Sequence, residues 1–237
     1  SLFKKWTGIL PEGFSIGNYA SLFSDPNFLA SVGRSVGMCI VPILLTIVIV
    51  LLALFVTTIY FPKLEKYVQI ICMIPYTIQG VILSVSILSL YVGNKSVLSN
   101  RMVMLMGAYC IVILPYIYQG IRNGMRAVNM VTLIEAAEML GASKIYAFFR
   151  VVVPNIISAI IVSSLLAVGI IFGDYVLIRN LAGTSAPNMQ IFLYQTMKSD
   201  STKASAVFVI IMFVTFVITA VVLFLKSREG KNRVQKK

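Results

Sequence analysis

The hydrophobic residues of this chain gather into five long stretches that contain no charged side chain. Each stretch has at least 20 residues, enough for a helix rising about 1.5 Å per residue to cross a hydrocarbon layer about 30 Å thick. Buried helices of soluble proteins are usually shorter. The pattern therefore predicts an all-α membrane protein with five transmembrane helices. The uncharged stretches are 35–62, 67–94, 102–121, 151–173 and 204–225.

Proline residues lie inside three of these predicted helices. Pro42, Pro75 and Pro115 each free a backbone carbonyl, which a membrane helix tolerates where neighbouring helices or water bind that carbonyl instead. Two interpretations stay open, namely kinks that serve packing alone and flexing points beside a transport path. The helices themselves are expected at about 31–59, 67–92, 102–121, 153–175 and 204–225.

Composition supports a membrane location and divides the chain into three regions. Hydrophobic residues make up 59% of the sequence and charged residues 12%, about half the charged fraction of a soluble domain. We expect an extracytoplasmic segment over 1–28, a transmembrane domain over 29–225 and a basic cytoplasmic tail over 226–237.

The net charge of +12 fits membrane topology better than nucleic-acid binding. Placing the basic tail in the cytoplasm puts 12 of the 20 Lys and Arg residues on that side, in the direction of the positive-inside rule. Lys4, Lys5, Lys198 and Lys203 oppose this excess. Five helices with a cytoplasmic C-terminus leave the N-terminus outside without an export signal, so we expect one preceding helix and six in the full protein.

The segment 122–150 between the third and fourth predicted helices differs from the rest. It is polar, yet its apolar residues recur at near-helical spacing. Thr132 precedes Glu135 by three positions, which predicts a capping box at a helix start. Gly141 predicts the end of that helix, because glycine tolerates the left-handed conformation. Two short helices meeting at a glycine are therefore expected, the second over 143–150.

A spaced motif runs through this segment into the next helix. Glu135-Ala136-Ala137 is followed after three residues by Gly141, and after nine more by Val-Val-Val-Pro ending at Pro154. This pattern resembles the EAA loop of permease subunits in binding-protein-dependent ABC importers, with valine in place of isoleucine and leucine. The glycine and proline in register make the resemblance more specific than the triplet alone.

The resemblance implies a loop that seats in a cleft of a separate ATPase. It further implies a second homologous permease, an extracytoplasmic substrate-binding protein and a location as a multi-pass protein of the bacterial plasma (inner) membrane. Small side chains permit close approach to the partner, and two larger apolar ones offer contact area. The residues expected to couple to the ATPase are Glu135, Ala136, Ala137, Met139, Leu140, Gly141 and Pro154.

No pattern for catalysis occurs in the sequence. The chain has no G-x-x-x-x-G-K-[ST] phosphate loop, no His, and three Cys without metal-site spacing, all inside predicted helices. We therefore expect a non-catalytic subunit that binds no cofactor itself, with ATP and magnesium held by the partner ATPase dimer.

Asp174 is the one acidic residue beside a predicted membrane helix, near its outer end. Acidic residues in such positions are costly and often functional. Asp174 either attracts a cationic substrate or pairs with Arg179, and both interpretations stay open. Further candidates for the lining of a substrate pathway are Tyr76, Gln79, Tyr109 and Tyr116.

Short matches around Ile74-Pro75-Tyr76 and Gly173-Asp174-Tyr175 most resemble permeases for polyamines and ferric iron. The resemblance implies a polyamine or related cation as substrate. Ferric iron, a sugar or another small solute are alternatives for the same importer role. A secondary transporter is a further alternative, although it would need coupling-ion ligands that the sequence scarcely offers.

Overall fold

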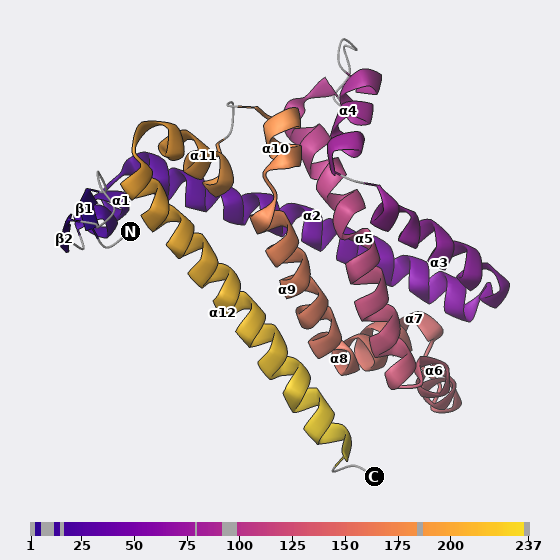
Figure 1. The fold of residues 1–237 in the computed structure, drawn as a ribbon. Coiled ribbons are helices and arrows are strands. Elements are labelled where there is room, and N and C mark those ends of the chain that lie inside the picture. The colour runs from indigo at the N-terminus through magenta and orange to yellow at the C-terminus, as the bar shows by residue number, and fades with distance from the viewer. Residues whose placement is uncertain are drawn as a thin grey trace.

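The computed structural model describes residues 3–5, 12–14, 17–78, 80–91, 99–183 and 187–234, which are almost entirely helical (Figure 1). The exception is an antiparallel pair of short strands, β1 (Phe3–Lys5) and β2 (Glu12–Phe14). A short helix α1 (Gly17–Phe23) follows this hairpin. The expected all-α class is confirmed, and the hairpin is an addition that the sequence pattern did not predict.

Three helices are long and apolar enough to cross a membrane, namely α2 (Pro26–Ile59), α5 (Arg101–Ala127) and the Ser201–Val221 part of α12 (Ser201–Val234). Two bent pairs of helices bring the number of spans to five if each pair is one span. This agrees with the five uncharged stretches of the sequence. Asp25 caps α2 by accepting a hydrogen bond from the backbone N–H of Asn27 at 2.9 Å.

The second predicted helix is the point where the structure differs most from the expectation. In place of one helix over 67–92, the chain forms the short turn η1 (Pro62–Leu64), helix α3 (Glu65–Met73), the 3₁₀ turn η2 (Ile74–Thr77) and helix α4 (Gly80–Tyr91). The axis of the first part, Pro62–Thr77, and the axis of α4 are bent by 100° relative to each other. Pro75, which cannot donate a backbone hydrogen bond, lies at the start of η2, and the helical run ends at Ile78, whose backbone is extended.

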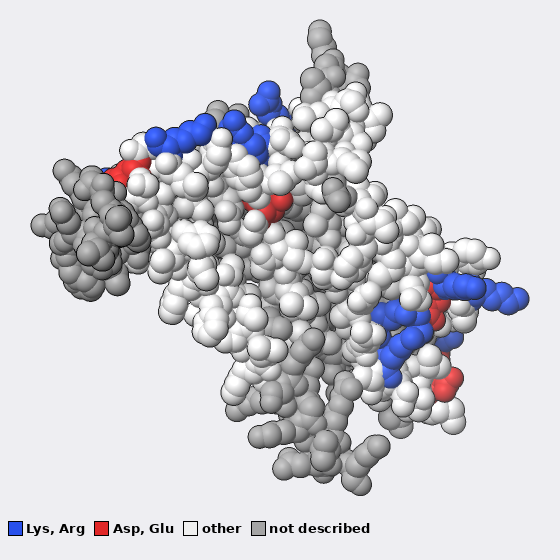
Figure 2. Space-filling view, in the orientation of Figure 1, with Lys and Arg blue, Asp and Glu red and all other residues white. Residues whose placement is uncertain are grey.

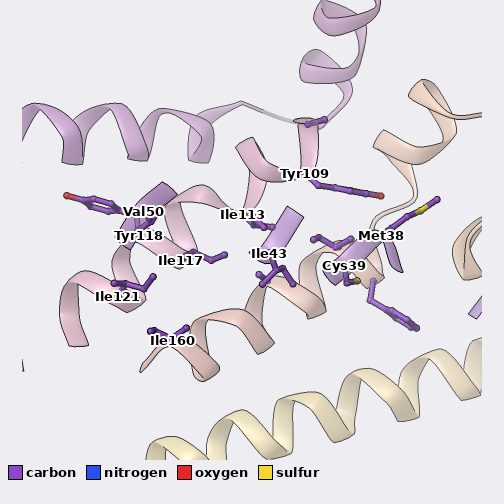
Figure 3. Packing of buried hydrophobic residues seen from close by; sticks show 14 of the residues in the cluster. Met38, Cys39, Ile43, Val50, Tyr109, Ile113, Ile117, Tyr118, Ile121 and Ile160 are labelled. Atoms are coloured by element: carbon purple, nitrogen blue, oxygen red, sulfur yellow. The ribbon is translucent and has the colours of Figure 1, made fainter. Parts of the chain in front are cut away.

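The core forms where α2, α5 and α9 (Ile157–Gly173) all pack against one another, and α12 lies along the other side of α9 (Figures 1 and 3). Figure 3 shows Ile113, Ile117 and Ile121 of α5 lying toward the residues of α2 and α9. All three isoleucines are fully buried. Their spacing of four places them on one face of the helix, which is the face that packs.

Small residues let α5 and α9 approach closely. A Cβ built on Gly124 would lie 2.6 Å from the Cβ of Ala159, and a Cβ on Gly120 would collide with Ser163. Glycines four positions apart opposite small residues four positions apart are a common way for membrane helices to pack. This contact fixes the distance between the helices on either side of the segment 122–150.

That segment forms the expected pair of short helices, α6 (Met130–Met139) and α7 (Lys144–Ala147). Gly141 lies between them with a φ of 84°. A π-helical turn η4 (Phe148–Val152) and the short α8 (Val153–Asn155) then lead to α9 through a 66° bend. The predicted capping box is wrong, because the N-cap is Asn129 and Thr132 lies inside the first turn of α6.

The opposite end of the bundle carries α10 (Val176–Leu181) and α11 (Met189–Ser199) (Figure 1). We call the end with α6 and α7 the loop end and the end with α10 and α11 the far end. In Figure 2, Lys and Arg side chains gather toward these two ends and leave a broad, mostly uncharged band between them. Such a band is what a bilayer requires of a protein that crosses it.

Candidate functional site

The tip of α6 presents two apolar side chains to solvent. Met139 and Leu140 are each 89% exposed, the highest values among the large hydrophobic residues that the structure describes. Glu135 and Ala136 on the same helix are also exposed. Apolar side chains held this far out from a structure usually mark a contact with another protein. Four of the predicted coupling residues, Glu135, Ala136, Met139 and Leu140, therefore form one exposed surface, which we call the tip.

The tip is held in place by a buried base. Ile134 of α6, Ala147 of α7 and Phe148 of η4 are at most 1% exposed. The Phe148 ring lies 4.6 Å from the ring of Phe55 on α2, centroid to centroid. Ala137 is half-buried against the core. The loop is thus a rigid attachment to the helices α2, α5 and α9 rather than a loosely tethered connector.

Gly141 and Pro154 lie at the two ends of the segment that joins α6 to α9. The backbone N–H of Gly141 donates to the carbonyl of Glu138 at 2.9 Å, and the N–H of Ala142 donates to the carbonyl of Ala137 at 3.0 Å. A left-handed glycine after the last helical turn satisfies carbonyls in this way. Pro154 is exposed in α8, which continues directly from η4.

A second region, the aromatic pocket, lies between η2, α5 and α9. Tyr76 and Tyr116 face each other there with ring centroids 4.9 Å apart. The cavity has a volume of about 360 Å³. Its other side chains are neutral amides, a hydroxyl and small apolar groups, so the wall is uncharged. The lining residues are Tyr76, Tyr116, Gln119, Gly120, Asn123, Gly124, Ala159, Val162, Ser163 and Leu166.

Asp174 lies elsewhere, at the far end of α9, and accepts a hydrogen bond from the phenol of Tyr109 at 3.2 Å. Its Oδ2 also accepts from the backbone N–H groups of Leu177 and Ile178 at 3.1 and 3.4 Å. The alternative of an ion pair with Arg179 is wrong. Arg179 instead lies over the ring of Tyr194, 5.8 Å from its centroid.

The predicted pathway residues thus separate into two pairs. Tyr76 and Tyr116 share the aromatic pocket, whereas Tyr109 is 1% exposed and bound to Asp174 in the core. Tyr109 therefore serves to hold Asp174 rather than to line the aromatic pocket. Gln79, the fifth candidate, lies outside the described residues.

The sequence also contained signals for residues that were not singled out. Gly120 and Gly124 form a G-x-x-x-G pattern in α5, and Ala159 and Ser163 repeat the same spacing on α9. Their apposition places Gln119 and Asn123 beside the pocket. The sequence pattern alone does not identify α9 as the partner of these glycines, because glycine pairs at this spacing also face lipid or other helices. The packing of α5 against α9 in the structure does.

Metal and disulfide chemistry find no support in the described part of the chain. No group of three or more Cys, Asp or Glu side chains there is arranged to hold a metal ion. Cys39, Cys72 and Cys110 are all free thiols, with Cys39 and Cys72 buried.

Comparisons with known proteins agree on the kind of protein. Residues 64–229 match the family model described as binding-protein-dependent transport system inner membrane component. A bacterial alginate ABC transporter, solved in complex with its alginate pentasaccharide-bound periplasmic protein, has a similar fold with a TM-score of 0.62 at 17% identity, covering 90% of this chain and 81% of that one. A bacterial ABC transporter involved in the import of the acidic polysaccharide alginate is similar at TM-score 0.62 and 16% identity, covering 92% and 84%. No curated protein matches the sequence.

Proposed function

This chain belongs to the family of binding-protein-dependent transport system inner membrane components, and we propose that it forms half of the translocation pathway of an ATP-driven importer. It is a non-catalytic, multi-pass subunit of the inner membrane. In our proposal ATP and magnesium are bound by a separate ATPase dimer, a second homologous permease supplies the other half of the pathway, and an extracytoplasmic binding protein delivers the solute.

The exposed tip carries the proposal for coupling. Met139 and Leu140 are 89% exposed, on a segment whose base is fully buried. Covering this apolar pair with a groove in a partner stabilises the complex by about 25 cal/mol per Å² of apolar surface buried. Because the base is packed between α2, α5 and α9, force applied at the tip passes to the membrane helices. We therefore place the loop end and the C-terminus in the cytoplasm, where an ATPase has access to ATP.

Co-purification with the ATPase and the second permease tests this role. Met139→Asp with Leu140→Asp places charge on the tip and should abolish both ATPase association and stimulated ATP hydrolysis. Met197→Asp is the matched control, because Met197 is 61% exposed at the far end. The control should keep association intact. Full association of the double variant would refute the assignment of the tip.

For the solute we propose a polyamine or a related cation. The aromatic pocket supports it, because Tyr76 and Tyr116 both line it and a cation within about 6 Å of a tyrosine face is attracted by the ring quadrupole. Asp174 adds one carboxylate at the far end of the same subunit. It is already bound by Tyr109, so it acts on a solute through its field rather than by direct contact.

A second candidate is a hydroxylated solute such as a saccharide. Gln119, Asn123 and Ser163 in the pocket wall are donors and acceptors that suit hydroxyl groups, and the two similar structures come from alginate importers. Thermal-shift measurements of spermidine and of oligosaccharides on the cognate binding protein distinguish the two. Uptake by Tyr116→Phe and Tyr116→Leu variants then tests the ring, since cation recognition survives the first change and not the second.

A further inference from the structure

A second pocket lies at the loop end, where α2, α3, α5 and the start of α6 meet. It has a volume of about 340 Å³ and is separate from both the tip and the aromatic pocket. One wall is apolar, formed by Leu54, Met125 and Met130. The other wall carries the guanidinium groups of Arg122 and Arg126.

The two arginines share one carboxylate. Arg122 donates to Oε1 of Glu65 from Nη2 at 2.8 Å and from Nε at 2.9 Å. Arg126 donates to the same oxygen from Nη2 at 3.0 Å. One carboxylate between two guanidiniums leaves the group with a net charge of +1. Each guanidinium has five N–H donors, so the two arginines keep N–H groups that are not used by Glu65. Guanidinium groups match the geometry of a phosphate.

The surroundings place the pocket at the level of lipid headgroups. Tyr60, Phe61 and Tyr67, at the end of α2 and the start of α3, are half or more exposed. Lys63 and Lys66 are interspersed with them and exposed. Exposed aromatic rings mixed with lysines are typical of the boundary between the hydrocarbon layer and water. A ligand of this pocket therefore has access from the bilayer surface.

We propose that this arginine pocket binds a phosphate group at the inner surface of the membrane, presented by the headgroup of an anionic phospholipid. The phosphate pairs with Arg126 and Arg122, and the apolar wall covers the glycerol and the first carbons of the acyl chains. A phospholipid contacts both the charged wall and the apolar wall, whereas free phosphate contacts only the charged wall. Thr132 in the first turn of α6 also lines the pocket, so the bound lipid lies against the base of the coupling loop.

Native mass spectrometry of the purified chain tests the proposal without any need for the ATPase, so a failure of the coupling role leaves it measurable. The chain is released from mixed micelles of phosphatidylglycerol and phosphatidylcholine, and retained lipid is counted. Wild type should retain phosphatidylglycerol preferentially. Arg126→Gln should lower that preference about fivefold, since the loss of one direct hydrogen bond to the phosphate, about 1 kcal/mol, changes an affinity by this factor. Arg126 is 61% exposed, so its replacement is expected to leave the fold intact.

Lys66→Gln is the matched control, because it removes an exposed charge at the same level that does not line the pocket. It should keep the preference. Excess inorganic phosphate separates the two sources: no loss of bound phosphatidylglycerol supports the lipid, and full displacement assigns the pocket to free phosphate. Equal retention of the two lipids by wild type together with no effect of phosphate would overturn the proposal, as would equal losses in Arg126→Gln and Lys66→Gln.

Discussion

Gly124 of α5 lies so close to Ala159 of α9 that a Cβ on the glycine would be 2.6 Å from the alanine Cβ. These helices flank the proposed coupling loop in the sequence, α5 before it and α9 after it. Their close approach therefore decides how the loop is presented at the end of the bundle.

Gly124→Ala should destabilise the protein, because neither helix backbone can yield to the added methyl group without losing other contacts. We expect a cost of about 1–3 kcal/mol, as for overpacked cores, measured as a lower thermal unfolding midpoint in detergent. Gly107→Ala is the control on the same helix, since nothing lies within 4 Å of that position. Equal midpoints for the two variants would contradict the close packing.

The hydrogen bond between Tyr109 and Asp174 predicts a second stability effect. Tyr109→Phe removes a phenol that donates to a carboxylate in a half-buried setting, and a hydrogen bond to a charged group contributes about 1.5–3 kcal/mol. The unfolding midpoint should fall accordingly. Tyr67→Phe, at a tyrosine that is 63% exposed, should leave it unchanged. A wild-type midpoint for Tyr109→Phe would mean that water replaces the phenol.

At Gly141 in the proposed coupling loop, a substitution would strain the backbone without creating a clash. The φ of 84° at this glycine is costly for any residue with a Cβ, yet nothing lies within 4 Å of a Cβ built there. Gly141→Val should therefore reduce stimulated ATP hydrolysis by reorienting the tip, while the core keeps its stability. Gly33→Val, at an open position in α2, serves as the control. Normal stimulation in Gly141→Val would show that the turn does not set the position of the tip.

Asp200 predicts how the start of α12 responds to pH. Its side chain accepts hydrogen bonds from the hydroxyl and backbone N–H of Thr202 at 2.8 and 3.0 Å, and from the N–H of Lys203 at 3.2 Å. These bonds, that from the Thr202 hydroxyl above all, lower the pKa of the carboxyl. A lowered folded-state pKa contributes stability above the unfolded value of about 3.9, and the contribution is lost as the pH falls through the folded pKa.

Asp200→Ala should cost about 1 kcal/mol at neutral pH, as for other lost helix caps. Asp200→Asn keeps a capping oxygen but does not titrate, so the difference in unfolding midpoint between wild type and this variant should shrink below about pH 4. A difference that stays constant from neutral to acidic pH would argue against the titration of Asp200.

The helical, membrane-spanning class of the fold was decided by the sequence itself. Five stretches of at least 20 uncharged residues have few alternatives to membrane helices, because hydrocarbon excludes charges and requires every backbone polar group to be hydrogen-bonded within the helix. The pair of short helices around Gly141 followed from local rules as well, since only the conformation of one residue ends α6. The EAA spacing likewise rests on positions along one short segment.

The partners of each helix were decided only by the tertiary structure. Sequence spacing placed Tyr76, Tyr109, Tyr116 and Asp174 in membrane helices, but it did not show that Tyr109 binds Asp174 while the Tyr76 ring packs against that of Tyr116. The sharp bend after Pro75 is likewise a feature that the sequence pattern did not predict. An apolar helix is compatible with lipid on every side, so its pattern does not say which face meets protein. Close packing, as at Gly124 and Ala159, makes that choice.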